Sequence, residues 1–266
     1  MVVYNLGVTH FLIFVQALLL TKAEFIPVQK APFQVQVELK SGSTFLAHAA
    51  ILNCKWVVTV ANAVNDFKPK DVQVRSGSGQ LGMHGGLHSV RHIVVHGNYT
   101  KKNQFLNNIA LIQIFYNFRL SKTVCPILLS ETVPKSYSEG QVSGWWANKQ
   151  GGQLELYESI NIVPLDKCLQ QYKEKNEIIN VDAPVLCSTP VKEVPVSLGL
   201  SLSMNTNLQG LLIKQIPGLP FVYTAMDRYV SWVKDTLSKM TYYNSGSNKE
   251  QCEGFHSNCV LQLFHR

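Results

Sequence analysis

Trp56–Val64 reads WVVTVANAV, and Asn107–Leu111 reads NNIAL. The first stretch is rich in β-branched residues and the second leads into the apolar run Ile109–Phe115, and such runs predict buried β-strands. Each run has asparagine beside it, Asn62 in the first stretch and Asn108 in the second. An asparagine amide has no useful basicity near neutral pH, so neither side chain can accept a proton from a nucleophile.

The rest of the chain repeats this pattern of short strand-like runs separated by Gly, Asn and Lys. A break near residues 117–130 divides the runs into two sets, and helices are expected only at Leu165–Tyr172 and Asp227–Met240. Many short strands with little helix predict an all-β fold of antiparallel barrels. The predicted strands are Phe33–Glu38, Thr44–Leu52, Trp56–Val60, Val72–Val74, Val90–Val95, Ile109–Phe115, Gly140–Trp145, Leu154–Val163, Pro184–Cys187, Gly210–Ile213 and Phe221–Thr224.

The N-terminal stretch of the chain predicts an exported protein. The apolar stretch Phe11–Leu20 is too short to span a bilayer and is followed by Thr21-Lys22-Ala23, which predicts a secretory signal peptide cleaved after Ala23. We therefore expect a signal peptide at 1–23, a folded domain at 24–240 and a polar tail at 241–266. The expected localisation is extracellular, with no other segment long enough to span a membrane.

The net charge of the chain excludes few classes of binding partner. The net charge is +7 and the isoelectric point about 9.0, but the lysines and arginines are dispersed. No run of them is dense enough for a nucleic-acid arm, so an ordinary basic surface is favoured over a polyanion or membrane-surface partner.

Six cysteines in an exported chain favour disulfides over metal ligands. Asn98-Tyr99-Thr100 is the one N-glycosylation sequon. Histidines recur every four residues at His84, His88, His92 and His96. On a strand such a spacing puts neighbours about 13 Å apart, too far for one ion, so we expect surface histidines, with no metal and no cofactor.

Eight segments in order resemble the trypsin-like (chymotrypsin-fold, peptidase S1) serine proteases. The resemblance runs from about Pro32 to Asp235 and implies two antiparallel six-stranded β-barrels with a C-terminal helix. The segments are QVQVELKSG, NCKWVVTVANAV, HIVVHGNYT, NNIALIQI, QVSGWW, SINIVPLDKC, LQGLLI and FVYTAMDRYVSWV.

The same resemblance places substitutions at all three catalytic positions. Those enzymes use a Ser nucleophile, a His base and a buried Asp that orients the His. Asn62 takes the histidine position of the T-A-A-H-C pattern, and Asn108 takes the aspartate position before I-A-L. Leu198 falls at the nucleophile, although a one-residue slip would put Ser197 there. No other histidine is near by sequence, so a relocated base is not expected.

The resemblance also implies that the supporting features are lost. Lys192 and Lys214 replace pocket residues, and Phe221 replaces a pocket glycine, which implies that its ring fills the pocket floor. No activation-cleavage site is present, and the loop Ser76–Leu87, which binds calcium in some relatives, has no carboxylate. Among the cysteines, Cys168 and Cys187 match a family pair. Cys54, Cys125, Cys252 and Cys259 allow three connectivities, of which Cys252–Cys259 is the most local and is favoured.

Two functions remain open. The first is a secreted, non-catalytic homologue that binds another secreted protein, such as a serine protease or its inhibitor, as a decoy or regulator. The second is a serine-type endopeptidase with a residual or unconventional active site. The tail at 241–266 is a third, weaker location for an interaction.

Overall fold

The run at Trp56 becomes the strand β4 (Trp56–Thr59) of a closed barrel, and NNIAL leads into its neighbour β7 (Ala110–Ile114). Trp56 pairs with Gln113 and Thr59 with Ala110. Every residue of both strands is buried, which explains their continuous apolar runs. The computed structural model describes residues 24–25, 27–145, 152–179, 182–191 and 197–244.

Six antiparallel strands close the first barrel in the order β2-β3-β4-β7-β6-β5. Alternation of apolar and polar residues predicted the first of them, β2, which pairs with β3 on one side and β5 on the other. The strands not yet given are β2 (Gln34–Leu39), β3 (Phe45–Ile51), β5 (Val72–Ser76) and β6 (Gly86–Val95).

Six further antiparallel strands close the second barrel in the order β9-β10-β11-β14-β13-β12, because β9 also pairs with β10. Two short strands extend this sheet: β1 (Glu24–Phe25) pairs with β10, and β8 (Leu128–Leu129) lies parallel to β13. The barrel strands are β9 (Glu139–Gly144), β10 (Glu155–Val163), β11 (Val185–Ser188), β12 (Ser201–Met204), β13 (Asn207–Lys214) and β14 (Phe221–Ala225).

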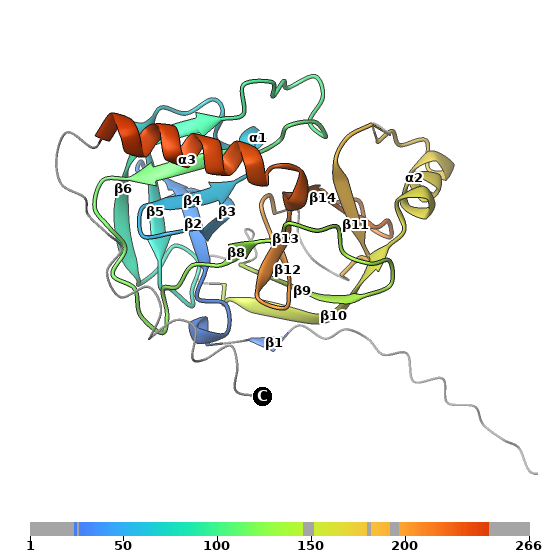
Figure 1. The fold of residues 1–266 in the computed structure, drawn as a ribbon. Coiled ribbons are helices and arrows are strands. Elements are labelled where there is room, and N and C mark those ends of the chain that lie inside the picture. Colours follow the sequence, from blue (N-terminus) through green and yellow to red (C-terminus); the bar gives the residue numbers. More distant parts are fainter. Residues whose placement is uncertain (1–23, 26, 146–151, 180–181, 192–196, 245–266) are drawn as a thin grey trace, which may run out of the picture.

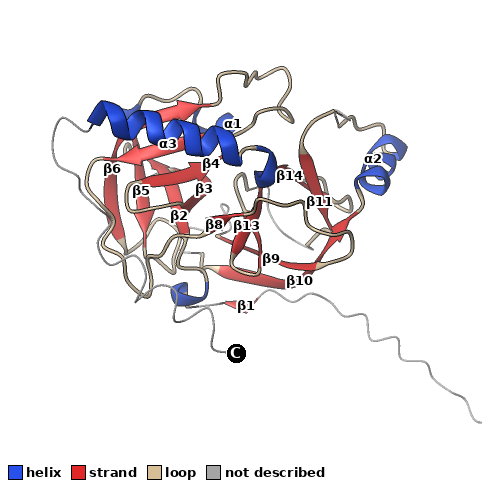
Figure 2. Cartoon of the chain, viewed as in Figure 1, coloured by secondary structure: helices blue, strands red, loops and turns tan. Residues whose placement is uncertain are grey.

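Helices lie at the periphery of the two barrels (Figure 2). α1 (Ala61–Val64) is a single turn after β4, and α2 (Leu165–Glu174) lies on the outside of the second barrel (Figure 1). α3 (Val230–Asn244) crosses the first barrel, where Val233 joins its apolar core. Three 3-10 helices occupy Val28–Lys30, Pro69–Asp71 and Met226–Arg228.

The fold therefore matches the predicted class of two six-stranded barrels with a C-terminal helix. The expected break near 117–130 lies between β7 and β9, and the domain limits at residues 23 and 240 stay predictions. β12 was not predicted. Its four residues, SLSM, are too few and too serine-rich to stand out, and the strand owes its place to pairing with β9 and β13.

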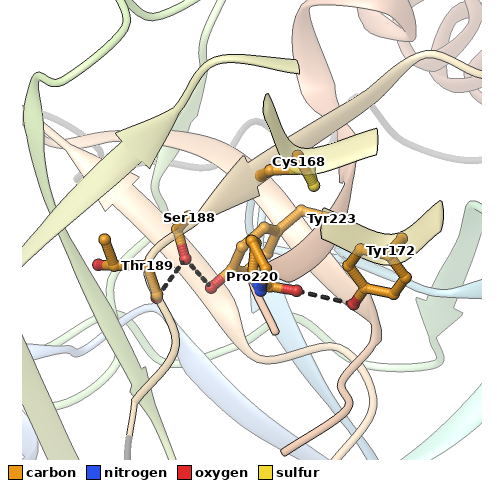
Figure 3. Close-up of a disulfide and its surroundings, with 7 residues drawn as sticks. Cys168, Tyr172, Ser188, Thr189, Pro220 and Tyr223 are labelled. Carbon is orange, nitrogen blue, oxygen red and sulfur yellow. Dashed lines mark hydrogen bonds between the residues drawn. A yellow bond between two sulfur atoms is a disulfide. The ribbon is translucent and has the colours of Figure 1, made fainter. Parts of the chain in front are cut away.

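A disulfide fastens α2 to the second barrel. It joins Cys168 to Cys187, as the resemblance implied. One helical turn after Cys168, the Tyr172 hydroxyl donates a hydrogen bond of 2.7 Å to the Pro220 carbonyl, so helix and barrel are held at two points (Figure 3). Burial raises the pKa of Tyr172, which keeps this donor protonated.

Cys54 and Cys125 also lie in disulfides, and both are buried in the first half of the chain. Cys168–Cys187 is the bridge that joins two described cysteines. Cys252 and Cys259 lie outside the described residues, so their direct pairing is still untested. The other two connectivities within one chain would fasten the tail to the first barrel.

We expect peptide mapping without reduction to link Cys54 and Cys125 to Cys252 and Cys259, in either order. Trypsin and Glu-C together place these four cysteines on separate peptides, because Lys55, Lys122 and Glu253 lie between them. Mass spectrometry of the linked peptides then reads the connectivity, with the Cys168–Cys187 bridge as internal control. A Cys252–Cys259 link accompanied by Cys54–Cys125 would contradict this expectation and restore the local pair.

Candidate functional site

Asn62 and Asn108 meet at the junction between α1 and the start of β7. The Asn62 main-chain N–H donates a 2.9 Å hydrogen bond to Asn108 Oδ1, and Asn108 Nδ2 donates one of 2.8 Å to the Gln104 carbonyl. Asn108 is fully buried. Both ends of its amide are thus used in holding the backbone, which is a structural role for an uncharged side chain.

The Asn62 side chain does not share in this pairing. Its Oδ1 is buried and has no hydrogen-bond partner among the described residues. The two asparagines are therefore joined through the main chain of Asn62 and not through their two side-chain amides. Neither residue offers a group that could carry a proton to or from a substrate.

His48 is the functional residue that sequence reasoning missed. It lies on β3 with its side chain fully buried, and its Nδ1 is 3.3 Å from Ser197 Oγ. The sequence showed no histidine near the nucleophile turn, and the fold brings His48 to it from a distant strand. The contact joins residues 149 positions apart, so only the pairing of the two barrels reveals it.

The hydrogen bonds of His48 fix its tautomer. The Trp145 main-chain N–H donates to Nε2 over 2.7 Å, so Nε2 carries no proton. Nδ1 faces the Leu198 carbonyl at 3.1 Å and must therefore be the protonated nitrogen. A nitrogen that already holds its proton cannot accept one from Ser197, so this Ser–His contact is not the nucleophile–base pair of a serine hydrolase.

Burial reinforces this conclusion. Desolvation is the largest cause that lowers the pKa of His48, to about 4, and the hydrogen bonds to Leu198 and Trp145 only partly oppose it. A base this weak is poorly matched to catalysis near neutral pH. Ser197 is itself 3% exposed, and its Oγ lies within 3.5 Å of the Trp145 carbonyl. No substrate can reach it without a rearrangement of the turn.

Two glycines make room for His48, Gly199 for its main chain and Gly144 for its ring. Gly199 has a φ of +77°, and a Cβ at this position would overlap the His48 carbonyl oxygen. A Cβ on Gly144 would lie 2.7 Å from the His48 ring. The ring stacks at an interplanar angle of 10° on Trp145. These contacts seat the imidazole in a fitted space between β3 of the first barrel and the Ser197–Gly199 turn of the second.

Lys214 spans the junction of the two barrels. Its Nζ forms a 2.8 Å ion pair with Glu177 Oε2 and lies 5.6 Å from the ring centre of Phe105 and 5.8 Å from that of Tyr172. Phe105 precedes β7 of the first barrel, whereas the other partners belong to the second. A lysine held by a carboxylate and two ring faces is fixed in place.

The other pocket residues are placed differently. Phe221 is 1% exposed and packs in the apolar core inside the second barrel. Its ring is thus part of the barrel core. Lys192 lies outside the described residues.

The four histidines at 84, 88, 92 and 96 have separate surroundings. His88 contacts Ser76 Oγ at 2.8 Å, and His96 packs against Tyr229 and Trp232 of the C-terminal helical segment. Within the described ranges, no group of three or more His, Cys, Asp or Glu side chains could hold a metal ion. In the same ranges, no helix is long and apolar enough to cross a membrane.

Fold and site together define a double-barrel protein of the chymotrypsin type, with Asn62 and Asn108 bonded to each other at the junction of α1 and β7. The family model described as Trypsin matches residues 23–233, and the chain belongs to this family. In sequence it is 25% identical to human (Homo sapiens) kallikrein-14 over 223 residues, covering 77% of this chain and 79% of that protein.

Inactive relatives are among the similar proteins. The crystal structure of the scabies mite inactivated protease paralogue S-I1 is 26% identical with a TM-score of 0.72, covering 82% of this chain and 99% of that one. The inactive serine protease scarface of Drosophila melanogaster is 24% identical over 162 residues, which cover 59% of this chain and 24% of that protein.

The lowered pKa of His48 predicts a loss of stability in acid. The unfolded chain binds a proton near pH 6.5 and the folded chain only near pH 4, so the free energy of unfolding falls as pH drops through this interval. The shift corresponds to roughly 3 kcal/mol in total. We expect urea unfolding at pH 7 and pH 4 to show this loss in the native protein and to show it largely removed in His48→Gln.

His84→Asn is the matched control, because His84 is an exposed histidine and asparagine tolerates its φ of +53°. It should leave the pH dependence close to that of the native protein. An unchanged pH dependence in His48→Gln would mean that His48 is not the buried neutral group described above.

Proposed function

We propose that this chain is a secreted pseudoprotease, a non-catalytic member of the trypsin family that acts by binding another protein. The single observation that carries the proposal is that none of the side chains named at this site is free to transfer a proton. Asn62 and Asn108 cannot transfer protons, and His48, the histidine that contacts Ser197 in the described part of the chain, has both ring nitrogens committed to main-chain groups. Assignment of Asn62, Asn108 and Leu198 to the three catalytic positions is part of this proposal.

The alternative function, a serine endopeptidase with an unconventional site, would have to use Ser197 and His48. Turning this contact into a working pair requires breaking the Trp145 or Leu198 hydrogen bond and exposing two buried side chains. The relatives described as inactive add support for the binding role. Its partner would be a second secreted protein, with a serine protease or protease inhibitor as the first class to examine.

A fluorophosphonate probe tests the proposal directly, because it labels serines activated by a general base. We expect no labelling of the purified protein under conditions that label active trypsin fully, and no difference between the native protein and Ser197→Ala. Covalent labelling of the native protein, abolished by Ser197→Ala, would overturn the pseudoprotease reading and make His48 the base to study next.

Secretion and glycosylation belong to the same proposal. The stretch ending at Ala23 supports export, and Asn98 is exposed in the segment that follows β6. We expect protein recovered from the medium of secreting cells to begin at Glu24 and to lose mass on treatment with an N-glycosidase, with Asn98→Gln as the unglycosylated control. Retention of residues 1–23 would contradict cleavage of a signal peptide after Ala23. An unchanged mass after treatment would contradict glycosylation at Asn98.

A further inference from the structure

A groove on the first barrel lies apart from the site described above. It opens between the β5–β6 hairpin and the segment that follows β7, and its volume is about 640 Å³. The residues used below to define this barrel-1 groove are Ser76, Gly85, Leu87, His88, Tyr116 and Arg119.

Large apolar side chains stand exposed at this groove. Tyr116 is 84% exposed and Leu87 is 54% exposed. Phe115, next to Tyr116, is 49% exposed, and its main-chain N–H bonds to the Ser89 carbonyl of β6. Aromatic and aliphatic groups gathered at one concave site, rather than scattered singly, are typical of surfaces that bind another molecule.

The groove is held in shape by its own contacts. Gly85 has a φ of +69°, and a Cβ there would overlap the Ser76 carbonyl oxygen, so hairpin and floor approach closely only because this residue is glycine. The neighbouring Arg75 pairs with the buried Glu38 at 2.7 Å and donates to the His84 carbonyl at 2.7 Å. The hairpin is thus fixed to β2, and a ligand would meet a preformed surface.

The charge around the groove is positive. Residues 27–125 contain eleven lysines and arginines but three carboxylates, whereas residues 126–244 contain ten and eleven. Two of those three carboxylates are already paired, Glu38 with Arg75 and Asp66 with Lys101. The excess positive charge of the chain therefore belongs to the first barrel.

None of the residues that line the groove is acidic. Arg119 lines it and is exposed, and Arg91 is exposed farther along β6, outside the residues that line the groove. His88, whose pKa is lowered by burial, is neutral near pH 7 and adds no charge. The groove thus presents the exposed guanidinium group of Arg119 beside apolar side chains.

We propose that the barrel-1 groove binds an acidic segment of a partner polypeptide that carries an aromatic or aliphatic anchor. The anchor packs against Leu87 and Tyr116, and the flanking carboxylates meet Arg119 and Arg91. Planar guanidinium groups suit carboxylates, which they bind with two parallel hydrogen bonds. This inference rests on the proposed binding role of the protein and specifies its surface and the chemistry of its partner.

The apolar exposure favours a polypeptide over a sulfated polysaccharide. A polyanion needs a strip of cations and gains nothing from an exposed Leu87 or Tyr116. An acidic peptide with an anchor uses both kinds of group in the hollow at once. Heparin therefore serves as a competitor whose behaviour separates the two ligand classes.

Fluorescence anisotropy on the full secreted protein tests the proposal. The probe is a fluorescein-labelled pool of twelve-residue peptides, each with four glutamates and two of Phe, Leu or Tyr in varied order. Two control pools replace every glutamate by glutamine or every anchor by alanine. We expect saturable binding of the first pool alone, weakened about tenfold or more between 50 and 300 mM salt.

Substitutions then locate the site. Tyr116→Ala and Arg119→Gln should each weaken binding about fivefold or more, whereas Lys135→Gln, which removes a charge from an exposed lysine of the other half of the chain, should change it less than about twofold. Equal thermal midpoints of unfolding in the three variants establish that the fold is intact. The hydrogen bond between the Phe115 and Ser89 main chains does not involve the substituted side chains, so the substitutions leave it in place.

Several results would overturn the proposal. These are no binding of the first pool up to about 1 mM peptide, equal binding of the glutamine pool, or equal loss in Lys135→Gln. Binding of the alanine pool that heparin displaces completely would assign the surface to polyanions instead. None of these outcomes bears on fluorophosphonate labelling. The proposal about the groove can therefore be overturned while the pseudoprotease proposal stands.

Discussion

One buried histidine joins the two barrels by three hydrogen bonds. His48 belongs to the first barrel, and both of its ring nitrogens bond to the main chain of the second, at Leu198 and Trp145. Its own main-chain N–H also donates to the Leu198 carbonyl, over 3.0 Å. Three hydrogen bonds from one residue thus join β3 to the end of β9 and to the Ser197–Gly199 turn. A buried polar group that is fully bonded in this way specifies one arrangement of its surroundings.

The chemistry of the site follows from that arrangement. Because the imidazole is committed to holding the turn, its proton is fixed on Nδ1 and it cannot serve Ser197 as a base. Asn108 plays the corresponding part on the other side, where it holds Asn62 and Gln104 by their main chains. Polar groups at this junction connect segments of backbone. The junction is therefore better suited to rigidity than to proton transfer.

Sequence patterns predicted the barrels for a physical reason, whereas the assignment of Asn62 and Asn108 to catalytic positions came from the family resemblance. Apolar runs such as Trp56–Thr59 are buried on both faces of a strand, so they stand out in sequence and fix the polar residues beside them. His48 gave no such signal, since on β3 it follows Ala47 and precedes Ala49 like any inward residue. Its partners lie 97 and 150 positions away, and only the glycine at 144 hints that a ring needs space. The position of Phe221 in the barrel core was likewise not readable from a pocket alignment.

The distribution of charge differs between the barrel junction and the first barrel. At the barrel junction Lys214 is already neutralised by Glu177 and covered by Phe105 and Tyr172, so it contributes little to attracting a partner. The uncompensated cations lie on the first barrel, where long-range attraction and exposed apolar side chains coincide at one preformed groove. Electrostatic attraction acts mainly on the rate of encounter and on the choice of partner, while buried apolar anchors supply most of the affinity. A protein whose barrel junction is rigid can therefore still be selective, because the proposed groove lies on a different barrel face and uses a different set of residues.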